Sequence, residues 1–251
     1  MLNSTATKIT SLLLLSFVVM SCQKNDTDLL QEAQSCLNTS PSREARNCVS
    51  KISSISTPAA SKLKCAAIYI QEGFGAASSL INGLNDMNNP SGGGGCAGNC
   101  SPTFAVINNF NFHSGDNLNS QNQAKNIATA NEAVEVCSHT ESKGYIQVSS
   151  LFKIGTMAKM SAFGALVSPT PGQEPTPTQI QAAIVGLPQS EIGQLVTTTY
   201  SLACTNITNP SDSTKKYCDQ LSGSIGTYGS NFSAIGQCLL GKINNEAYVC
   251  P

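Results

Sequence analysis

The chain has 251 residues, a formal net charge of −1 and 12% charged residues, against roughly 25% in a typical soluble domain. With so few charges, uncharged polar side chains must cover much of the surface. No basic face is available for a phosphate backbone, so nucleic acid is excluded as an expected partner.

The first element in the chain is a short apolar run from Ile9 to Met20, preceded by the single cation Lys8. A helix that crosses the hydrocarbon core of a bilayer needs roughly 20 apolar residues, so this run is too short to span it. Its length fits the apolar region of about 7 to 15 residues in a secretory signal peptide. We therefore predict that residues 1–21 are a signal peptide, absent from the mature protein.

The run ends in Val19-Met20-Ser21-Cys22, which resembles the lipobox of bacterial lipoproteins: an aliphatic, a variable and a small residue before a lipidated cysteine. The resemblance implies that Cys22 carries the lipid and becomes the mature N-terminus. By the same resemblance, Gln23 favours sorting to the outer membrane of a double-membraned bacterium. Several acyl chains on one residue make a stable anchor, because each buried CH2 contributes about 0.8 kcal/mol. We expect an exported, lipid-anchored envelope protein, on the periplasmic or the surface side.

Export also changes the interpretation of the remaining ten cysteines, because thiols outside the cytosol are oxidised in pairs. We predict disulfides among them. The candidates are Cys36, Cys48, Cys65, Cys96, Cys100, Cys137, Cys204, Cys218, Cys238 and Cys250.

Helical spacing of apolar residues dominates the mature chain, and the alternation typical of strands is scarce. We predict an all-α fold, either a disulfide-stapled helical bundle or an array of helical hairpins. The clearest helix should begin near Pro58, after Thr57 as its cap, and end before the Asn88-Asn89-Pro90 breaker. Its apolar stripe consists of Leu63, Ala67, Ile70, Phe74, Ala77, Ile81 and Leu84.

Two more helices are predicted over about residues 117–138 and 142–167, from the same periodicity. The second has a stripe of mostly small residues, which allow helices to approach closely. The stripe consists of Val148, Leu151, Gly155, Ala158, Ala162 and Ala165.

Two segments interrupt the helices. Residues 88–100 contain four consecutive glycines and must form a loop, because glycine carries too much backbone freedom for a regular element. Residues 168–179 contain four prolines, which favour an extended connector or an ordinary surface loop. We divide the mature chain into an N-terminal helical region (22–168), a Pro-rich connector (169–178) and a C-terminal helical region (179–251).

The segments that start at Ser35 and Ala203 resemble each other: Cys, one residue and Asn are followed by Pro-Ser, basic residues and a second Cys. One interpretation is that the C-terminal region partly repeats residues 35–70 and packs with them as one domain. Ser42 or Ser211 is a candidate cap for the second helix of each copy.

The same pattern predicts two disulfide pairings. Leu29, Ala33 and Cys36 share one helix face, and so do Ala45, Cys48, Ile52 and Ile55. A short antiparallel hairpin joins such faces, so we predict Cys36–Cys48 and, by the repeat, Cys204–Cys218. Cys65 lies off the stripe of its own helix and must reach a different neighbour.

The sharpest alternative is a zinc site around the glycine loop. Cys96, Cys100 and His113 have the spacing C-x3-C-x12-H, which supplies three of the four ligands of a tetrahedral site. Cys137 or His139 is the candidate fourth ligand. This hypothesis predicts a metal-assisted envelope enzyme, whereas a disulfide within or from the loop would remove its ligands.

No nucleophile elbow, phosphate loop or recognisable carboxylate pair is present, so we assign no catalytic residue, metal ligand or cofactor. Phe104, Phe110 and Phe112 form the densest aromatic cluster, which we interpret as a core anchor, with a recognition surface as the alternative. The expected function is a non-enzymatic binding or structural role of a membrane-anchored envelope lipoprotein, with the membrane and an envelope or extracellular protein as partners.

Overall fold

A computed structural model describes residues 25–74, 102–205, 212–245 and 247–250. Within these ranges every regular element is helical and no strand is present, so the predicted all-α class is confirmed. The α-helices are α2 (Asp26–Thr39), α3 (Ala45–Cys48), α4 (Pro58–Gln71), α6 (Pro102–Asn109), α7 (Ser120–Ser138), α8 (Lys143–Gly164), α9 (Pro177–Val185), α10 (Gln189–Thr199), α11 (Asp212–Tyr228) and α12 (Phe232–Asn244).

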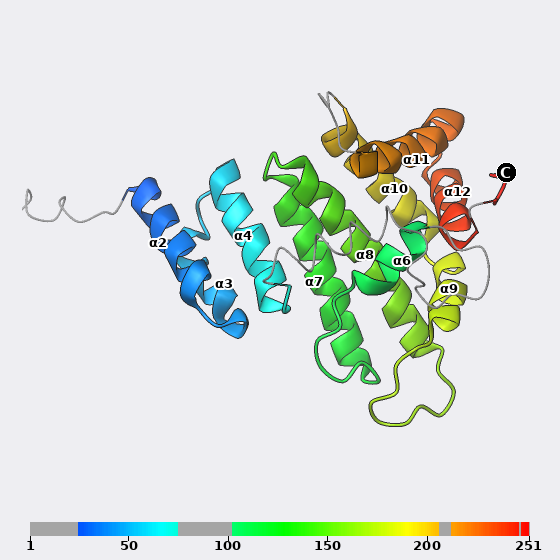
Figure 1. The fold of residues 1–251 in the computed structure, drawn as a ribbon, viewed down its shortest axis with the longest axis horizontal. Coiled ribbons are helices and arrows are strands. Elements are labelled where there is room, and N and C mark those ends of the chain that lie inside the picture. The colour runs from blue at the N-terminus through cyan, green and yellow to red at the C-terminus, as the bar shows by residue number, and fades with distance from the viewer. Residues whose placement is uncertain (1–24, 75–101, 206–211, 246, 251) are drawn as a thin grey trace, which may run out of the picture.

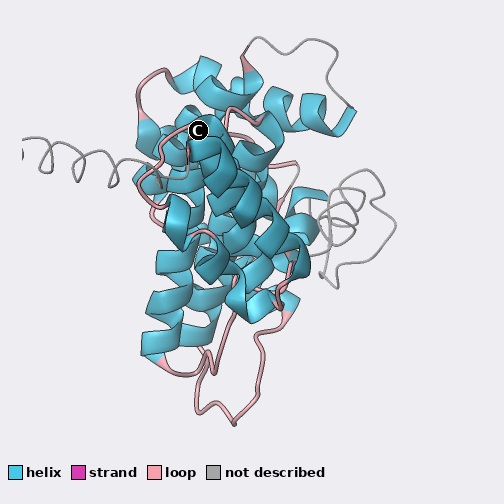
Figure 2. Ribbon diagram, turned by 90° about the vertical axis from the view of Figure 1, so that its left-hand side faces the viewer, coloured by secondary structure: helices cyan, strands magenta, loops and turns pink. Residues whose placement is uncertain are grey.

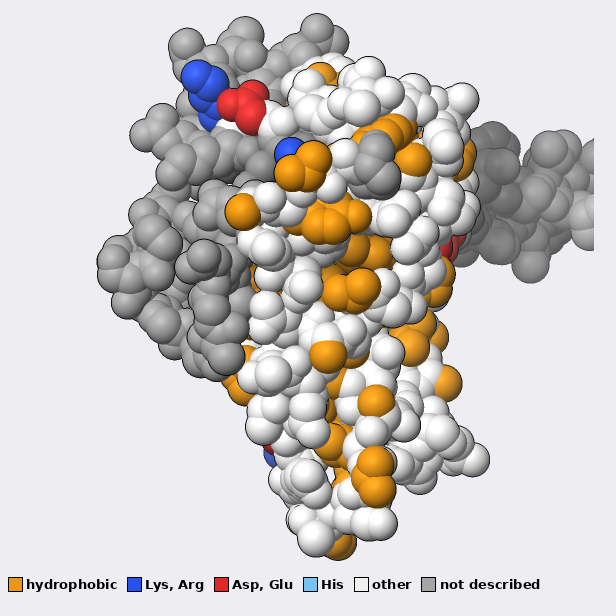
Figure 3. Space-filling view, turned by 90° about the vertical axis from the view of Figure 1, so that its right-hand side faces the viewer, with side chains coloured by type: hydrophobic (Ala, Val, Ile, Leu, Met, Phe, Trp, Pro, Cys, Tyr) orange, Lys and Arg blue, Asp and Glu red, His pale blue; other side chains and the backbone are white. Residues whose placement is uncertain are grey.

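Apart from α6, which lies beyond α7 and α8, the helices follow one another roughly in chain order along the long axis of the molecule (Figure 1). Helices α2 and α3 lie at one end, α4 lies between them and the α7–α8 pair, and α9 to α12 gather at the other end. Loops connect the helices throughout, as the orthogonal view shows (Figure 2). Few charged side chains appear among the described residues on the face drawn in Figure 3, as expected from the composition.

Capping residues set several of the helix starts. The side chain of Asn25 accepts a hydrogen bond from the backbone N–H of Asp28 at the start of α2. Thr57 caps α4 through the N–H of Ala60, and Pro58 occupies the first turn, as predicted. A reciprocal capping box between Thr176 and Gln179 begins α9. Such a cap satisfies amide groups that lack a partner inside the helix.

Helix α4 ends earlier than predicted, at Gln71 rather than just before Asn88. Gly73 adopts a left-handed φ of 89°, its N–H bonds the carbonyl of Ile70, and the N–H of Phe74 bonds the carbonyl of Tyr69. This is a Schellman motif, which ends a helix at a glycine that tolerates positive φ. The later part of the predicted stripe, Ala77, Ile81 and Leu84, lies outside the described residues.

Helix α4 has two buried faces, whereas its sequence pattern indicated only one. Ala67, with Leu63 and Ile70 beside it, packs against α2 and α3. Ile68 and Tyr69 face the opposite way and join the main core. The helix therefore links the N-terminal hairpin to the rest of the molecule.

The second helix of the N-terminal hairpin is broken. A 3₁₀ turn (Ser42–Glu44), the four-residue α3 and another 3₁₀ turn (Ser50–Ile52) replace the expected continuous helix. Ser42 makes no side-chain capping bond, so its predicted role as a cap is wrong: it is itself the first residue of the first turn. Ser211 lies outside the described residues. The predicted apolar face is nevertheless buried, with Ile52 fully covered.

The main core is built around α8, which is buried on almost every side. Its cluster combines residues of α4, α6 and α7 with residues of α9 to α12, so helices from both sides of the Pro-rich connector share one core. The connector itself is held to α8 by an ion pair between Lys159 and Glu174 at 2.9 Å. At the end of the predicted stripe, Ala165 is exposed because α8 has already ended at Gly164.

Glycines produce the closest helix contacts. A Cβ at Gly155 of α8 would lie 2.1 Å from the carbonyl oxygen of Phe110, which confirms that the small-residue stripe allows close approach. Helices α10 and α12 cross in the same way. A Cβ at Gly193 would lie 1.8 Å from the carbonyl oxygen of Phe232, and one at Gly236 would lie 1.9 Å from that of Gln189.

This crossing gives a direct test of the packing. Gly236→Ala is expected to lower the free energy of unfolding by about 1–3 kcal/mol, because the new methyl group forces two backbones apart. Gly223→Ala in α11 is the matched control: no atom from outside its own stretch of helix lies within 4 Å of its Cβ position, so better helix propensity should raise stability by up to about 1 kcal/mol. Urea denaturation measures both, and equal effects of the two substitutions would contradict the close crossing.

Candidate functional site

Four disulfides staple the part of the chain that the structure describes, and both pairings predicted from the hairpins are present. Cys36 of α2 bonds Cys48 of α3, and Cys204 bonds Cys218 of α11. Cys65 of α4 reaches a different neighbour, Cys137 of α7. The fourth bridge joins Cys238 to Cys250 and ties the end of the described chain to α12.

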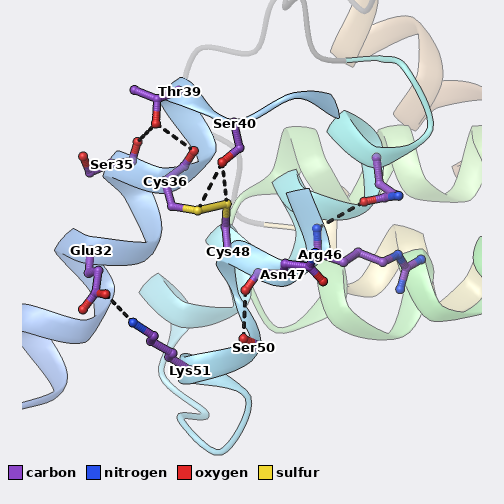
Figure 4. Close-up of a disulfide and its surroundings, with 11 residues drawn as sticks. Glu32, Ser35, Cys36, Thr39, Ser40, Arg46, Asn47, Cys48, Ser50 and Lys51 are labelled. Carbon is purple, nitrogen blue, oxygen red and sulfur yellow. Dashed lines mark hydrogen bonds and ion pairs between the residues drawn. A yellow bond between two sulfur atoms is a disulfide. The ribbon is translucent and has the colours of Figure 1, made fainter. Parts of the chain in front are cut away.

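The first bridge lies in a small polar environment at the end of α2 (Figure 4). The hydroxyl group of Ser40 lies 3.4 Å from the sulfur of Cys36 and 3.4 Å from that of Cys48. An ion pair between Lys51 and Glu32 joins the same two segments. These contacts, together with the bridge, fix α2 against the segment that contains α3.

The hairpin is attached to the body on its other side. Arg46 donates hydrogen bonds from one nitrogen, Nη1, to both carboxylate oxygens of Glu132 in α7, at 2.6 and 2.8 Å. Both side chains are more than a third exposed, so the pair contributes little on its own, on the order of 1 kcal/mol or less. The ion pair fixes the position of α3 relative to α7.

The predicted zinc residues are only partly described. Cys96 and Cys100 lie outside the described residues, while His113 is exposed and its Nδ1 lies 3.2 Å from the carbonyl oxygen of Asn111. Cys137 is not available as the fourth ligand, because its sulfur is bonded to Cys65. His139 is an exposed residue that caps the end of α7. No metal-binding group of three or more side chains occurs among the described residues.

The loop around His113 is held by a buried asparagine that sequence reasoning did not single out. Asn126 of α7 donates to Asn117 Oδ1 at 2.7 Å and to the carbonyl oxygen of Ser114. It also accepts a hydrogen bond from the backbone N–H of Ser114 at 3.1 Å. Such a network satisfies the buried polar groups and fixes the loop.

The three phenylalanines after the glycine loop are core residues. Phe104, Phe110 and Phe112 are at most 2% exposed, which confirms that they anchor the segment and rules them out as a recognition surface. Phe110 and Phe112 join Tyr69 and the less buried Phe74 around Phe152 of α8.

Tyr69 is the unusual member of this aromatic group. Its hydroxyl group is buried and has no hydrogen-bond partner among the described residues. Burial, with a smaller contribution from Tyr145, raises the pKa of the Tyr69 phenol far above its ordinary value. The phenol therefore stays neutral at every physiological pH and cannot act as a base.

An apolar groove of about 630 Å³ lies between α2 and α4, with Tyr145 from the first turn of α8 as a further lining residue. Its apolar lining residues are Leu30, Ala59, Leu63, Ala66 and Tyr145, and its polar ones are Thr27, Gln31, Gln34 and Lys62. Sites for apolar ligands are concave, largely apolar and about 300–1,000 Å³ in volume. Among the described residues, this groove is the strongest candidate for a binding site.

None of the helices in the described ranges is both long and apolar enough to cross a bilayer. Comparison with known proteins gives no match to a family model, to a curated protein or to a solved structure.

Proposed function

We propose that the protein is a lipid-anchored component of the cell envelope that acts without catalysis, through binding or structural contacts. The outer membrane is the proposed location, because Gln23 follows the cysteine of the lipobox-like sequence. The proposed partners are the membrane, through a lipid on Cys22, and an envelope or extracellular protein.

The observation that carries this proposal is the state of the cysteines. Every cysteine in the described ranges belongs to a disulfide. Disulfides persist in exported proteins and are rare in the reducing cytosol. This agrees with the short apolar run and the Val19-Met20-Ser21-Cys22 sequence, which favour export and lipidation by an independent route.

The non-enzymatic part of the proposal is supported by the surroundings of the candidate catalytic groups. Both histidines are exposed, and the ring of His113 is hydrogen-bonded to the backbone carbonyl group of Asn111 within its own loop. The metal-assisted alternative has lost one proposed ligand, since Cys137 is oxidised. The described residues supply no observation in its favour.

Mass spectrometry of the membrane-bound protein, purified under alkylating and non-reducing conditions, tests the proposal. The expected N-terminal peptide begins at Cys22, carries the mass of a lipid and contains no free thiol. Cys22→Ser is the matched control, and we expect this variant to lose the lipid and to leave the membrane fraction. An unmodified Cys22 in an uncleaved chain would overturn lipidation. Stoichiometric zinc that is lost in His113→Ala would favour the enzyme instead.

A further inference from the structure

The groove lies between α2 and α4, and Leu63 of α4 is one of its lining residues. If the C-terminal region repeats residues 35–70, as the cysteine pattern indicates, α10 and α12 take the places of α2 and α4, and these two helices are in backbone contact at Gly193 and Gly236. Gly236 precedes Cys238 by two residues, and Leu63 precedes Cys65 by the same interval. A leucine therefore occupies the position at which α12 has a glycine, and its side chain lines the groove.

The composition of the groove favours an unbranched apolar ligand. Leu30, Leu63 and Ala66 are only partly buried, so they leave apolar surface open to water. The polar lining residues are mostly amide and hydroxyl side chains, and Lys62 is the one charged side chain among them. Such a site supplies hydrophobic contact along its length and few directional hydrogen bonds, which suits a hydrocarbon chain better than a polar metabolite.

The lining residues of the groove lie close in sequence to Cys22, the proposed site of lipidation. Thr27 lines it, and Cys22 precedes Thr27 by five residues. Even a fully extended segment of this length spans at most about 18 Å. Acyl chains attached to Cys22 are therefore always within reach of the groove, at a high effective concentration.

We propose that the groove binds one acyl chain of the lipid on Cys22. The inference rests on the proposed lipidation. Every CH2 group of an acyl chain that stays in water is unfavourable, so the groove covers part of the lipid whenever the protein is outside a bilayer. A lipidated protein that must pass between two membranes needs its acyl chains to be covered in this way.

The experiment uses the lipidated full chain with a photoreactive benzophenone amino acid in place of Ala66, diluted below the micelle-forming concentration of its detergent. After irradiation, the digest should contain the residue-66 peptide joined to the Cys22 lipopeptide. The same amino acid at Asn38, which is exposed on α2 and lies outside the groove, is the matched control and should give no such product. A product with phospholipid, with another protein, or at the control level overturns the proposal.

A second arm separates this inference from lipidation. The Cys22→Ser chain, which carries no lipid, should bind palmitate at a ratio of one to one in calorimetry. Ala66→Glu and Ala59→Glu should each weaken binding by about tenfold or more, because a charge then borders the apolar chain, whereas Asn38→Glu should not. If palmitate binds but the native Cys22 peptide proves unmodified, the proposed lipidation fails while the groove keeps its acyl specificity. If palmitate does not bind, the groove proposal fails, whatever the state of Cys22.

Discussion

Replacement of Cys65 and Cys137 together by alanine is expected to lower the free energy of unfolding by about 4 kcal/mol. The bridge closes a segment with a sequence separation of 72, and the chain-entropy model gives about that value for a loop of this length. Both sulfur atoms belong to fully buried residues that join α4 to α7, so the loss also removes packing between these two helices in the main core. Urea denaturation of the oxidised proteins measures the change.

The matched control is the double substitution of Cys36 and Cys48 by alanine. That bridge has a sequence separation of 12, for which the same model gives about 3 kcal/mol. The two variants differ in what they release: one frees α4 from α7, the other only frees α2 from α3. A larger loss for the short bridge, or no loss for the long one, would contradict the stapling role assigned to Cys65–Cys137.

Local sequence patterns predicted the parts of this fold that depend on local geometry. Cys36 and Cys48 are close in sequence, on two amphipathic segments with a proline-containing turn between them, so a hairpin alone determines their pairing. Thr57 followed by Pro58 marked the start of α4 correctly, because the cap acts within one helical turn. The periodicity of α7 and α8 placed both helices to within a few residues.

The rest depended on contacts between distant segments. The partner of Cys65 is in α7, and no local spacing selects Cys137 among the remaining cysteines. The second buried face of α4 could not be predicted from the spacing. The stripe with Leu63 already explained one apolar face of the helix, so Ile68 and Tyr69 beside it gave no separate signal. The end of α4 at Gly73 was missed for a different reason: the apolar spacing continues beyond it, while the chain turns at a glycine with positive φ.

The candidate groove could not be predicted from the sequence either. Its lining residues come from three helices, and most of them are ordinary helix surface residues in isolation. The signal that could have found it is the comparison of the two cysteine patterns: Leu63 and Gly236 occupy the same interval before a third cysteine, and a large residue in place of a small one at a helix crossing opens a space. That comparison becomes informative only when Gly236 is known to lie at a crossing.

Phe152→Ala is expected to lower the free energy of unfolding by about 3–5 kcal/mol, the usual cost of emptying a buried aromatic site. Phe152 is fully buried, and its ring lies 4.9 Å from that of Phe110, 4.7 Å from Phe74 and 5.0 Å from Tyr69, centroid to centroid. These neighbours are the residue that follows α6, the last residue of the Schellman motif that ends α4, and a residue of α4 itself. The cavity therefore opens where three parts of the chain meet, and no single side chain can relax to fill it.

Tyr69→Phe in the same cluster keeps the ring and removes a buried hydroxyl group that has no partner within the described ranges. Because an unpaired buried polar group costs free energy, this control should leave stability unchanged or raise it slightly. Thermal and urea denaturation of both variants distinguish the two effects. If Tyr69→Phe loses as much stability as Phe152→Ala, the hydroxyl group is hydrogen-bonded in the native protein. If Phe152→Ala loses little stability, the aromatic cluster is not the centre of the core. A large loss in Phe152→Ala with none in Tyr69→Phe would show that ring packing, rather than polar contacts, joins α4, α6 and α8.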